Sequence, residues 1–527
     1  MQTPRSVAPG QLKTMIHDGE ELALLDVREA GQFGESHLLF ATPLPYSRLE
    51  IDVVSLASRK SVRIVLCDDG ASGVAELAHK RLAAIGYTDI ALLEGGTRGW
   101  AAAGYALFAG VNVPSKLFGE LVEHAYHTPS VTVTELARMK AAGEDFVIID
   151  GRPFTEYQKM NIPGGICCPN AELPYRISEI VKSPRTKIVV NCAGRTRSIL
   201  GAQTLINFGV VNPVCALENG TQGWVLADFE LERGASKRYP DSIDQTELPR
   251  LKQQAAKLAA RHGVRAAAAA EVQSWLADPR RTTCLIDVRT HEEFKAGSLP
   301  GALHAPGGQL VQATDQWVGV RNARIVLVDS DGVRAPVVAS WLTQLGCEAY
   351  VLEGGTQANV AAPPAEKPDL PAVLRLTAGE LKPLLDAGAC TVIDLGPGMA
   401  FRKAHIPGSK WSIRPRIVDT AHDVKAPVVL VAEDEDMARL AAIDLTEAGI
   451  TNIKVLDGGP AAWTAAGYPT EASPDMPSDS ECIDYLFFVH DRHAGNREAM
   501  KQYLAWETGL MAQLDEQDRK LFRVGTT

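Results

Sequence analysis

Basic residues are the minority among the charged residues of this 527-residue sequence, which has 53 Lys and Arg against 64 Asp and Glu and a formal net charge of -11. Proteins that bind nucleic acids or anionic membranes need clustered Lys and Arg to neutralise phosphates. We therefore expect no nucleic-acid partner and no membrane partner. The sequence also lacks an apolar run long enough to span a bilayer and an amino-terminal signal segment. This composition is typical of a cytoplasmic protein.

Cysteine is scarce and unpatterned. The nine cysteines are an odd number, and only Cys167 and Cys168 stand in a close pair. These features exclude a disulfide framework and a zinc ribbon. Histidines could suggest a metal site, but no cluster of carboxylates or cysteines accompanies them at ligand spacing. The histidines concerned are His124, His127, His490 and His493. We expect no metal and no organic cofactor.

The sequence does contain a fourfold repeat. Four short apolar runs, LALLD, FVIID, CLID and TVID, end at Asp26, Asp150, Asp287 and Asp394. About 40 residues after each aspartate, a second apolar run leads to Cys67, Cys192, Asp329 and Ala432, respectively. A third run then enters a glycine turn, as in CALENGTQGW. Four copies at near-constant spacing indicate tandem domains of one kind, and the chain length itself suggests about three to five domains.

The order of elements within each copy predicts an α/β fold. Continuous apolar runs of about five residues are typical of strands buried on both faces, as in a parallel sheet. A helical pattern closed by a glycine, such as Gly209, follows the second run. Strands that alternate with helices imply a mainly parallel sheet with helices on both faces. Ligands of such sheets bind beyond the carboxyl ends of the strands, which is where Cys192 stands.

The connections between the copies suggest six segments. We expect 1–109 to be repeat 1, 110–235 to be a linker helix plus repeat 2, and 236–262 to be a polar linker between two halves. We expect 263–368 to be repeat 3, 369–472 to be repeat 4, and 473–527 to be a helical tail. The helical spacing of apolar residues in the tail indicates that it docks either on the body or on a partner chain.

The second repeat carries motifs of a known family. The run IIDGRPFTEYQKMNIPGG resembles the D-x-R, aromatic and I-P-G-A signature of rhodanese domains. NCAGRTRS resembles their active-site loop, and LENGTQGW is similar to their closing G-G-x-x-x-W turn. The resemblance extends from Gln11 to Tyr468. It implies four rhodanese-like domains in tandem and a sulfurtransferase of the thiosulfate sulfurtransferase type.

Repeats 3 and 4 depart from the family pattern at the nucleophile. Repeat 3 has Asp329 where the family places its cysteine, and repeat 4 has Ala432. Repeat 4 also has Gly396 in place of the Arg of the D-x-R motif. Neither side chain at the nucleophile position can form a persulfide, so we expect both repeats to be inactive.

Repeat 1 keeps a cysteine, Cys67, but its loop reads CDDGASG and has no arginine. The carboxylates of Asp68 and Asp69 are expected to raise the pKa of the thiol and to repel an anionic donor. We therefore expect Cys67 to be a weak or silent secondary thiol, although it could receive sulfur from a protein partner.

The loop at Cys192 favours the thiolate, which is the species that attacks sulfur. Two arginines add positive charge, successive backbone N–H groups can form an anion-binding nest, and a helix presents its positive end. Gly194 can supply a positive φ where the loop needs one. The residues predicted to bind the donor are Ala193, Gly194, Arg195, Thr196, Arg197 and Ser198.

We predict a two-step transfer through a persulfide of Cys192. Arg195 and Arg197 would hold the sulfonate of a small anionic donor such as thiosulfate, and cyanide or a thiol would accept the sulfur. A protein persulfide could also be the donor. The resemblance implies that Asp150 and Arg152 form an internal salt bridge that supports the site.

The remaining cysteines are predicted to pack in the core, because free cysteine is among the most buried residue types. They are Cys215, Cys284, Cys347, Cys390 and Cys482. Cys167 and Cys168 are also expected in the core, with the alternative that one of them resolves an oxidised Cys192.

Two other classes of function stay open. Three degenerate copies favour a non-catalytic sulfur carrier or scaffold. Rhodanese domains also resemble certain phosphatases and arsenate reductases, whose loop has an Arg six residues after the Cys. Here Ser198 occupies that position and Arg197 comes one residue early. This smaller loop disfavours the phosphatase and reductase interpretations.

Overall fold

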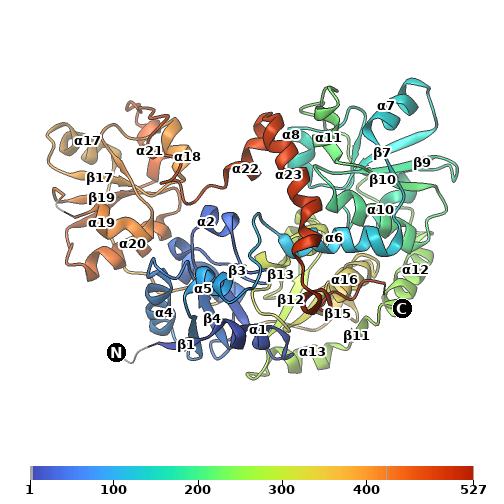
Figure 1. Ribbon diagram of the computed structural model, residues 1–527, viewed down its shortest axis with the longest axis horizontal. Coiled ribbons are helices and arrows are strands. Elements are labelled where there is room, and N and C mark those ends of the chain that lie inside the picture. The colour runs from blue at the N-terminus through green and yellow to red at the C-terminus, as the bar shows by residue number, and fades with distance from the viewer. Residues whose placement is uncertain (1–3, 423, 526–527) are drawn as a thin grey trace. The chain divides into compact units, whose positions relative to one another are not determined.

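The computed structural model describes residues 4–422 and 424–525, with the backbone alone at Phe488, His493 and Ala494. Within these residues the chain forms four five-stranded sheets, one in each repeat (Figure 1). Every strand pair in them is parallel, and helices flank each sheet. The predicted α/β class and the fourfold repeat are confirmed.

All four sheets have the same strand order, in which the first strand pairs with the fifth and the fourth strand is central. In repeat 1 the order is β1 (Arg5–Val7), β5 (Ile90–Leu93), β4 (Ile64–Cys67), β2 (Ala23–Asp26), β3 (Thr42–Pro43). In repeat 2 it is β6 (Ser130–Val131), β10 (Val214–Leu217), β9 (Lys187–Asn191), β7 (Phe146–Asp150), β8 (Ile166–Cys167). In repeat 3 it is β11 (Arg265–Ala267), β15 (Glu348–Leu352), β14 (Arg324–Val328), β12 (Thr283–Asp287), β13 (Leu303–His304). In repeat 4 it is β16 (Leu374–Leu376), β20 (Ile453–Leu456), β19 (Val428–Val431), β17 (Thr391–Asp394), β18 (Lys410–Trp411).

The strands coincide with the apolar runs of the sequence. Each of the four aspartate-terminated runs forms a strand whose last residue is that aspartate, as in β7. The second run forms the central strand, which is buried over nearly its whole length in every repeat. Burial on both faces explains why these runs are apolar throughout instead of alternating.

The helices lie between the strands. Repeat 1 contains α1 (Pro9–His17), α2 (Ala30–Glu35), α3 (Leu49–Leu56), α4 (Val74–Ala84) and α5 (Gly96–Ala102). Repeat 2 contains α7 (Val133–Ala141), α8 (Phe154–Lys159), α9 (Leu173–Ile180), α10 (Thr196–Phe208) and α11 (Gly220–Leu226). Repeat 3 contains α13 (Ala269–Leu276), α14 (His291–Ala296), α15 (Gly307–Gln312) and α16 (Arg334–Gln344). Repeat 4 contains α17 (Ala378–Asp386), α18 (Gly398–Lys403), α19 (Ile417–Thr420), α20 (Glu435–Glu447) and α21 (Gly459–Ala465).

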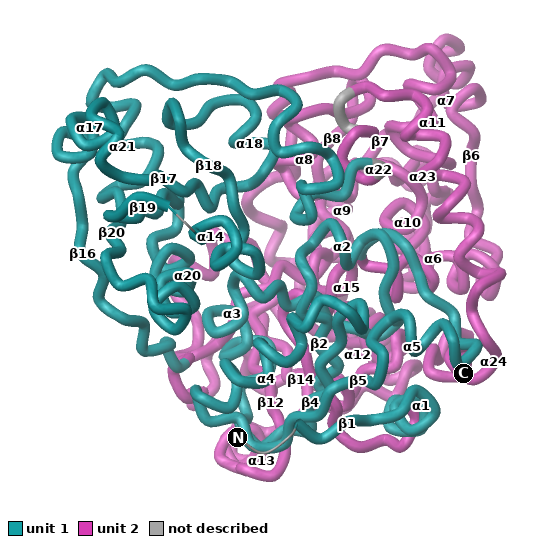
Figure 2. Tube along the Cα trace, turned by 60° about the vertical axis from the view of Figure 1, so that its left-hand side comes forward, with its two compact units in different colours: residues 1–16, 23–111, 366–487 teal, residues 17–22, 112–365, 488–527 magenta. Residues whose placement is uncertain are grey.

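The chain divides into two compact units that do not follow its amino- and carboxyl-terminal halves (Figure 2). Unit 1 comprises residues 1–16, 23–111 and 366–487, and so contains repeats 1 and 4. Unit 2 comprises residues 17–22, 112–365 and 488–527, and so contains repeats 2 and 3 with the end of the tail. The segment 236–262, expected to link two halves, therefore lies inside unit 2.

Repeats 1 and 4 are joined within unit 1 by a buried ionic network. Arg414 of repeat 4 pairs with Glu50 of repeat 1 at 2.6 Å and with Asp444 of its own repeat at 3.0 Å. Arg81 of repeat 1 pairs with the same Asp444. All of these side chains are nearly inaccessible to solvent. Each buried charge is thus matched by an opposite one, as burial requires.

Repeats 2 and 3 are joined within unit 2 by helices. The segment between repeats 1 and 2 forms α6 (Val113–Tyr126), which packs on α10, and α12 (Leu248–Arg261) packs on α16. The apolar face of α12, with Leu251, Ala255 and Leu258 at helical spacing, explains why this part of the expected linker is a docked helix. Trp341 of repeat 3 donates to Thr204 Oγ1 of repeat 2 at 2.8 Å.

The tail forms three α-helices among the described residues: α22 (Phe487–His490), α23 (Arg497–Gly509) and α24 (Glu516–Arg519). Helix α23 docks on the body of unit 2, beside α11 and α6 (Figure 1). Arg497, at its start, donates to the carbonyl oxygens of Val225 and Leu226 at the end of α11. Across the described residues, no helix is both long and apolar enough to cross a membrane.

Candidate active site

Cys192 directly follows β9, the central strand of the repeat 2 sheet, and α10 begins four residues later. Its side chain is buried, with 2% of the residue exposed. The Cys192 carbonyl oxygen accepts a hydrogen bond from the Thr221 N–H at 2.9 Å. Gly220 permits this contact, since a Cβ there would lie 2.2 Å from that oxygen. The glycine turn after β10 therefore anchors the residue at the strand end.

The Cys192 thiol lies against the first turn of α10. It donates to Ser198 Oγ at 3.7 Å, and Ser198 Oγ in turn donates to the Arg195 carbonyl oxygen at 2.7 Å. Ser198 is fully buried. The sulfur is thus held at the amino-terminal end of a 13-residue helix, where the helix dipole favours negative charge.

The two loop arginines are both held in ion pairs. Arg195 pairs with Glu120 of α6 at 2.8 Å and also with Glu123. Arg197 forms a two-pronged pair with Glu156 of α8, with both distances 2.8 Å. Both guanidinium groups are therefore fixed by carboxylates of neighbouring helices, which the sequence pattern did not indicate.

Some backbone N–H groups of the loop remain available as hydrogen-bond donors to an anion. Among the described residues, the backbone N–H groups of Ala193, Gly194 and Arg195 donate to no partner. The next N–H, that of Thr196, donates to Glu507 Oε1 at 3.3 Å, and the Thr196 hydroxyl donates to the same oxygen at 2.7 Å. A carboxylate from the tail helix α23 therefore stands at the opening turn of α10.

Glu507 was not identified from the sequence. It is 311 positions from Thr196, and the sequence indicates only that the tail is helical. Its carboxylate is fully buried and lies 3.4 Å from Lys116 Nζ of α6. Gly194 makes room for it, because a Cβ at Gly194 would lie 2.8 Å from Glu507 Oε2. Gly194 has no positive φ, so its small size, not its conformational freedom, is what the structure uses.

Asp150 and Arg152 form a buried pair below the loop. Arg152 donates to both carboxylate oxygens of Asp150, at 2.9 and 2.6 Å, and to the Met160 carbonyl oxygen at 2.6 Å. Asn191, the last residue of β9, donates to Asp150 Oδ2 at 3.2 Å. The pair thus ties the end of β7 to the residue that precedes Cys192.

Cys67 of repeat 1 ends β4 and is fully buried. Burial raises the pKa of its thiol well above the usual range, and the nearby carboxylates, Asp68 and Asp69 among them, add to that shift. Asp68 also accepts the N–H groups of Gly70 and Ala75, at 2.7 and 3.2 Å. The expected direction of the pKa shift is present, but its main cause is burial, which the loop sequence does not reveal.

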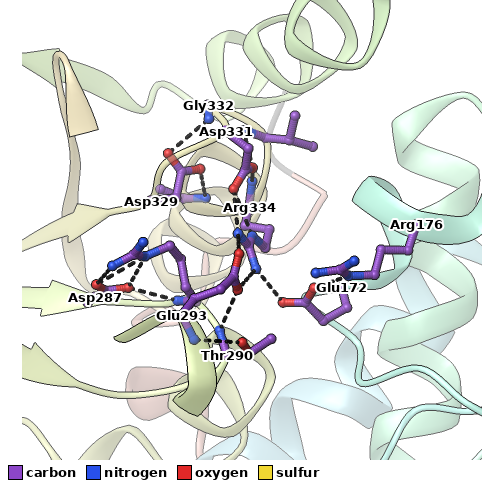
Figure 3. A network of polar contacts seen from close by, with 12 residues as sticks. Glu172, Arg176, Asp287, Thr290, Glu293, Asp329, Asp331, Gly332 and Arg334 are labelled. Carbon is purple, nitrogen blue, oxygen red and sulfur yellow. Dashed lines mark hydrogen bonds and ion pairs between the residues drawn. The ribbon is translucent and has the colours of Figure 1, made fainter. Parts of the chain in front are cut away.

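In repeat 3 the residue that corresponds to Cys192 is Asp329, which Figure 3 shows together with its partners. Asp329 accepts the N–H groups of Gly332 and Ala335 at 2.9 and 2.8 Å. Arg334, which is fully buried, pairs with Asp331 and with Glu293. The side chains of this loop thus bond to its own backbone N–H groups and to one another.

The repeat 3 loop also contacts repeat 2. Arg334 pairs with Glu172 of repeat 2 at 2.9 Å, and Glu172 pairs with Arg176 at 2.6 Å (Figure 3). The residues of the degenerate loop therefore contribute to the packing of unit 2.

Repeat 4 has neither a nucleophile nor the buried pair. Ala432 follows β19, and the Asp394 carboxylate accepts the N–H of Gly396, which stands in place of the motif's Arg, at 2.8 Å. Asp434 accepts the Asp436 N–H at the start of α20. In this loop too, an acidic side chain accepts a hydrogen bond from a backbone N–H group of the loop.

The other cysteines lie in the protein interior, apart from Cys347, which is partly exposed. The buried ones among them are Cys167, Cys168, Cys215, Cys284, Cys390 and Cys482. Burial raises the pKa of Cys167 to about 12 and also raises that of Cys168. Neither thiol is poised to ionise, which favours packing over the resolving role.

The metal interpretation finds no support in the part of the chain that the structure describes. No group of three or more His, Cys, Asp or Glu side chains there could hold a metal ion. Of the four histidines considered, the side chain of His493 lies outside the described residues.

A family model matches this chain four times. The model is that of the rhodanese-like domain, and it matches residues 8–103, 132–227, 268–362 and 377–466. A crystal structure of a thiosulfate sulfurtransferase from Pseudomonas aeruginosa is 42% identical, with a TM-score of 0.91 over 99% of both chains.

Shorter stretches of the chain also match curated proteins. Thiosulfate sulfurtransferase GlpE of Pseudomonas aeruginosa is 29% identical over 101 residues, which are 19% of this chain and 90% of that protein. An HTH-type transcriptional regulator of Mycobacterium tuberculosis is 33% identical over 112 residues, which are 21% of this chain. The match spans about half of that regulator, 48% of its length.

Proposed function

This chain belongs to the family of proteins built from rhodanese-like domains, and we propose that it is a sulfurtransferase that works through Cys192. It would move sulfane sulfur from thiosulfate or a similar anionic donor to cyanide or a thiol. The name of the similar Pseudomonas aeruginosa structure, a thiosulfate sulfurtransferase that matches over 99% of both chains, supports this choice of donor.

One observation carries the proposal. The repeat 2 loop combines a cysteine with three consecutive backbone N–H groups, those of Ala193, Gly194 and Arg195, that no described residue occupies. In repeats 1 and 3 the third of the corresponding N–H groups, that of Gly70 and of Gly332, donates to a carboxylate of the loop itself. A sulfur anion or an anionic donor at Cys192 would find unused hydrogen-bond donors and a helix amino terminus.

The first step forms the persulfide. The Cys192 thiolate attacks the outer sulfur of thiosulfate, a bond forms between the two sulfurs, and the S–S bond of thiosulfate breaks. Sulfite leaves with the electron pair of that bond. The free N–H groups of the loop stabilise the charge on the sulfur, and Arg197 adds a positive charge that acts on Cys192.

The second step regenerates the enzyme. Cyanide attacks the outer sulfur of the Cys192 persulfide, and thiocyanate leaves while Cys192 returns to the thiolate. A thiol acceptor would instead take the sulfur as its own persulfide. The two steps alternate through one covalent intermediate and give ping-pong kinetics. The transfer as written requires no metal and no organic cofactor.

We propose that the other repeats catalyse no reaction. In repeat 3, Arg334 joins the degenerate loop to Glu172 of repeat 2, so this repeat supports the catalytic one. We propose that repeat 4 has a similar supporting role for repeat 1, to which Arg414 joins it. The scaffold function thus applies to parts of the chain and not to its whole.

The proposal is tested by turnover with thiosulfate and cyanide, measured as thiocyanate formed. Cys192→Ala is expected to reduce turnover to the uncatalysed rate, since the nucleophile is lost. Cys215→Ala is the matched control, because Cys215 is a buried cysteine of the same sheet that takes no part in the chemistry. Turnover in Cys192→Ala equal to that of the control would refute the role of Cys192.

A further inference from the structure

The tail helix α23 packs over the loop that carries Cys192. Glu507 is fully buried, and it is the last glutamate before the helix ends at Gly509. Its Oε1 accepts the N–H and the hydroxyl of Thr196. Tyr503, one turn earlier, would lie 3.3 Å from a Cβ at Gly194. The helix therefore lies directly over the loop in which the proposed chemistry occurs.

The carboxylate of Glu507 is charged in this position. Burial alone would raise the pKa of the group, but Lys116 and the hydrogen bonds from Thr196 hold it below its usual value. Lys116 is itself buried and lies 3.4 Å from Glu507 Oε1. The tail thus places a negative charge at the loop that is proposed to bind a negatively charged donor.

The other loops show what this carboxylate replaces. The N–H groups that correspond to that of Thr196, four residues after the nucleophile position, are those of Ala71 and Val333, and they donate to Asp69 and Asp331 of the same loops. Those carboxylates are attached to the loops whose N–H groups they accept. In repeat 2 the carboxylate arrives on a separate helix, 311 positions away from Thr196. A group supplied in this way can be withdrawn while the loop stays folded.

We propose that Glu507 is a displaceable internal anion, and that an anionic sulfur donor reaches Cys192 only when α23 moves away from the loop. The inference rests on the proposed function of Cys192. Glu507 is in this sense a specificity-determining residue, since it selects against small anions unless they can take its place at Thr196 and Lys116.

One carboxylate oxygen of Glu507 lacks a hydrogen-bond partner, which agrees with a group that a ligand with more hydrogen bonds can displace. Its Oε2 is buried and has no hydrogen-bond partner among the described residues. A buried polar atom without a partner costs about 1 to 3 kcal/mol. The sulfonate of a donor has three oxygens and could use Thr196, Lys116 and the free N–H groups of the loop together.

The experiment measures how fast Cys192 is alkylated by neutral iodoacetamide and by anionic iodoacetate, with the modified peptide identified by mass. Glu507→Gln keeps the shape of the side chain and removes its charge. We expect this variant to raise the ratio of the iodoacetate rate to the iodoacetamide rate by about tenfold, because a like charge no longer repels the anion. Glu507→Ala removes the obstruction as well and is expected to raise both rates.

Two further variants control the experiment. Glu498→Gln changes an exposed glutamate on the same helix and is expected to leave both rates unchanged. Lys116→Gln combined with Glu507→Gln removes both charges, so that no unpaired buried charge destabilises the fold. This double variant is also expected to show a higher rate ratio than Lys116→Gln alone.

A second readout follows the helix directly. Sulfate, an anion that cannot transfer sulfur, is expected to increase amide hydrogen exchange in residues 497–509 of the unmodified protein. The same addition to Glu507→Ala is expected to have a smaller effect, because no internal carboxylate remains to be displaced.

The outcomes separate this inference from the proposed function. Alkylation rates in Glu507→Gln and Glu507→Ala within twofold of the unmodified protein would overturn the inference, even if Cys192 transfers sulfur. A changed rate ratio with no sulfur transfer in any variant would support the displaceable anion and refute the sulfurtransferase.

Discussion

Removal of Arg152 tests the physical basis of the site most simply. Arg152→Met keeps the length of the side chain but leaves the Asp150 carboxylate without its cation. Asp150 and Arg152 are only 1% and 2% exposed, so solvent cannot replace the lost partner. Loss of one partner from a buried ion pair costs about 3 to 5 kcal/mol. Two hydrogen bonds to the carboxylate and one to Met160 would be lost in the change.

The assay must report on repeat 2 alone, because a protein of several domains does not unfold in one step. Amide hydrogen exchange of residues 187–191, in the central strand β9, measures the free energy of opening that strand. A loss of about 3 to 5 kcal/mol corresponds to an increase of roughly 10² to several thousandfold in the exchange rate. Exchange in residues 428–431, in repeat 4, serves as the internal reference.

Two variants complete the measurement. Arg138→Met removes an exposed arginine of the same repeat, whose pair with Glu144 is largely open to solvent, and is expected to cost under about 1 kcal/mol. Asp150→Asn combined with Arg152→Met removes both charges and is expected to be more stable than Arg152→Met alone. A loss under about 1 kcal/mol in Arg152→Met, or a double variant no more stable than it, would refute the reasoning.

Two other results are expected. Cys67→Ser should leave turnover with thiosulfate nearly unchanged, because burial holds the pKa of that thiol well above neutral pH; a large loss of thiocyanate formation would show that the repeat 1 loop takes part. Burial and the charge of Asp331 raise the pKa of Asp329 to about 7, so the folded protein retains a proton that the unfolded chain loses above about pH 4. Stability therefore falls as the pH rises from about 4 to 7, by up to about 1.4 kcal/mol per pH unit. Asp329→Asn should reduce this slope, measured as the free energy of opening of residues 324–328 from amide hydrogen exchange at pH 5 and pH 7, and an equal slope in both proteins would contradict the assignment.

The architecture of each repeat could be predicted from the sequence because its elements are local. The runs that end at Asp26, Asp150, Asp287 and Asp394 are strands, since burial on both faces of a parallel sheet demands continuous apolar residues. The fourfold comparison also predicted that Cys192 follows the carboxyl end of a strand, and the structure shows that this strand is the central one. The family membership that these motifs implied is confirmed by the four matches to the rhodanese-like domain.

The surroundings of the loop could not be predicted, because they come from distant segments. Glu120 of α6 and Glu507 of α23 carry no local pattern that assigns them to the Cys192 loop. The pairing of repeat 1 with repeat 4 likewise depends on single long-range contacts, such as that of Arg414 with Glu50. Periodicity reports which face of an element is buried, but not which segment covers it.

The measurement that tests the central claim most directly is the mass of the peptide that contains Cys192 after incubation with a sulfur donor. Thiosulfate, mercaptopyruvate and the persulfide of a cysteine desulfurase form the panel of donors. We predict that at least one of them adds a single sulfur atom, about 32 Da, to this peptide, and that cyanide removes it. Absence of added sulfur on the Cys192 peptide with every donor, in protein shown to be folded, would contradict the account.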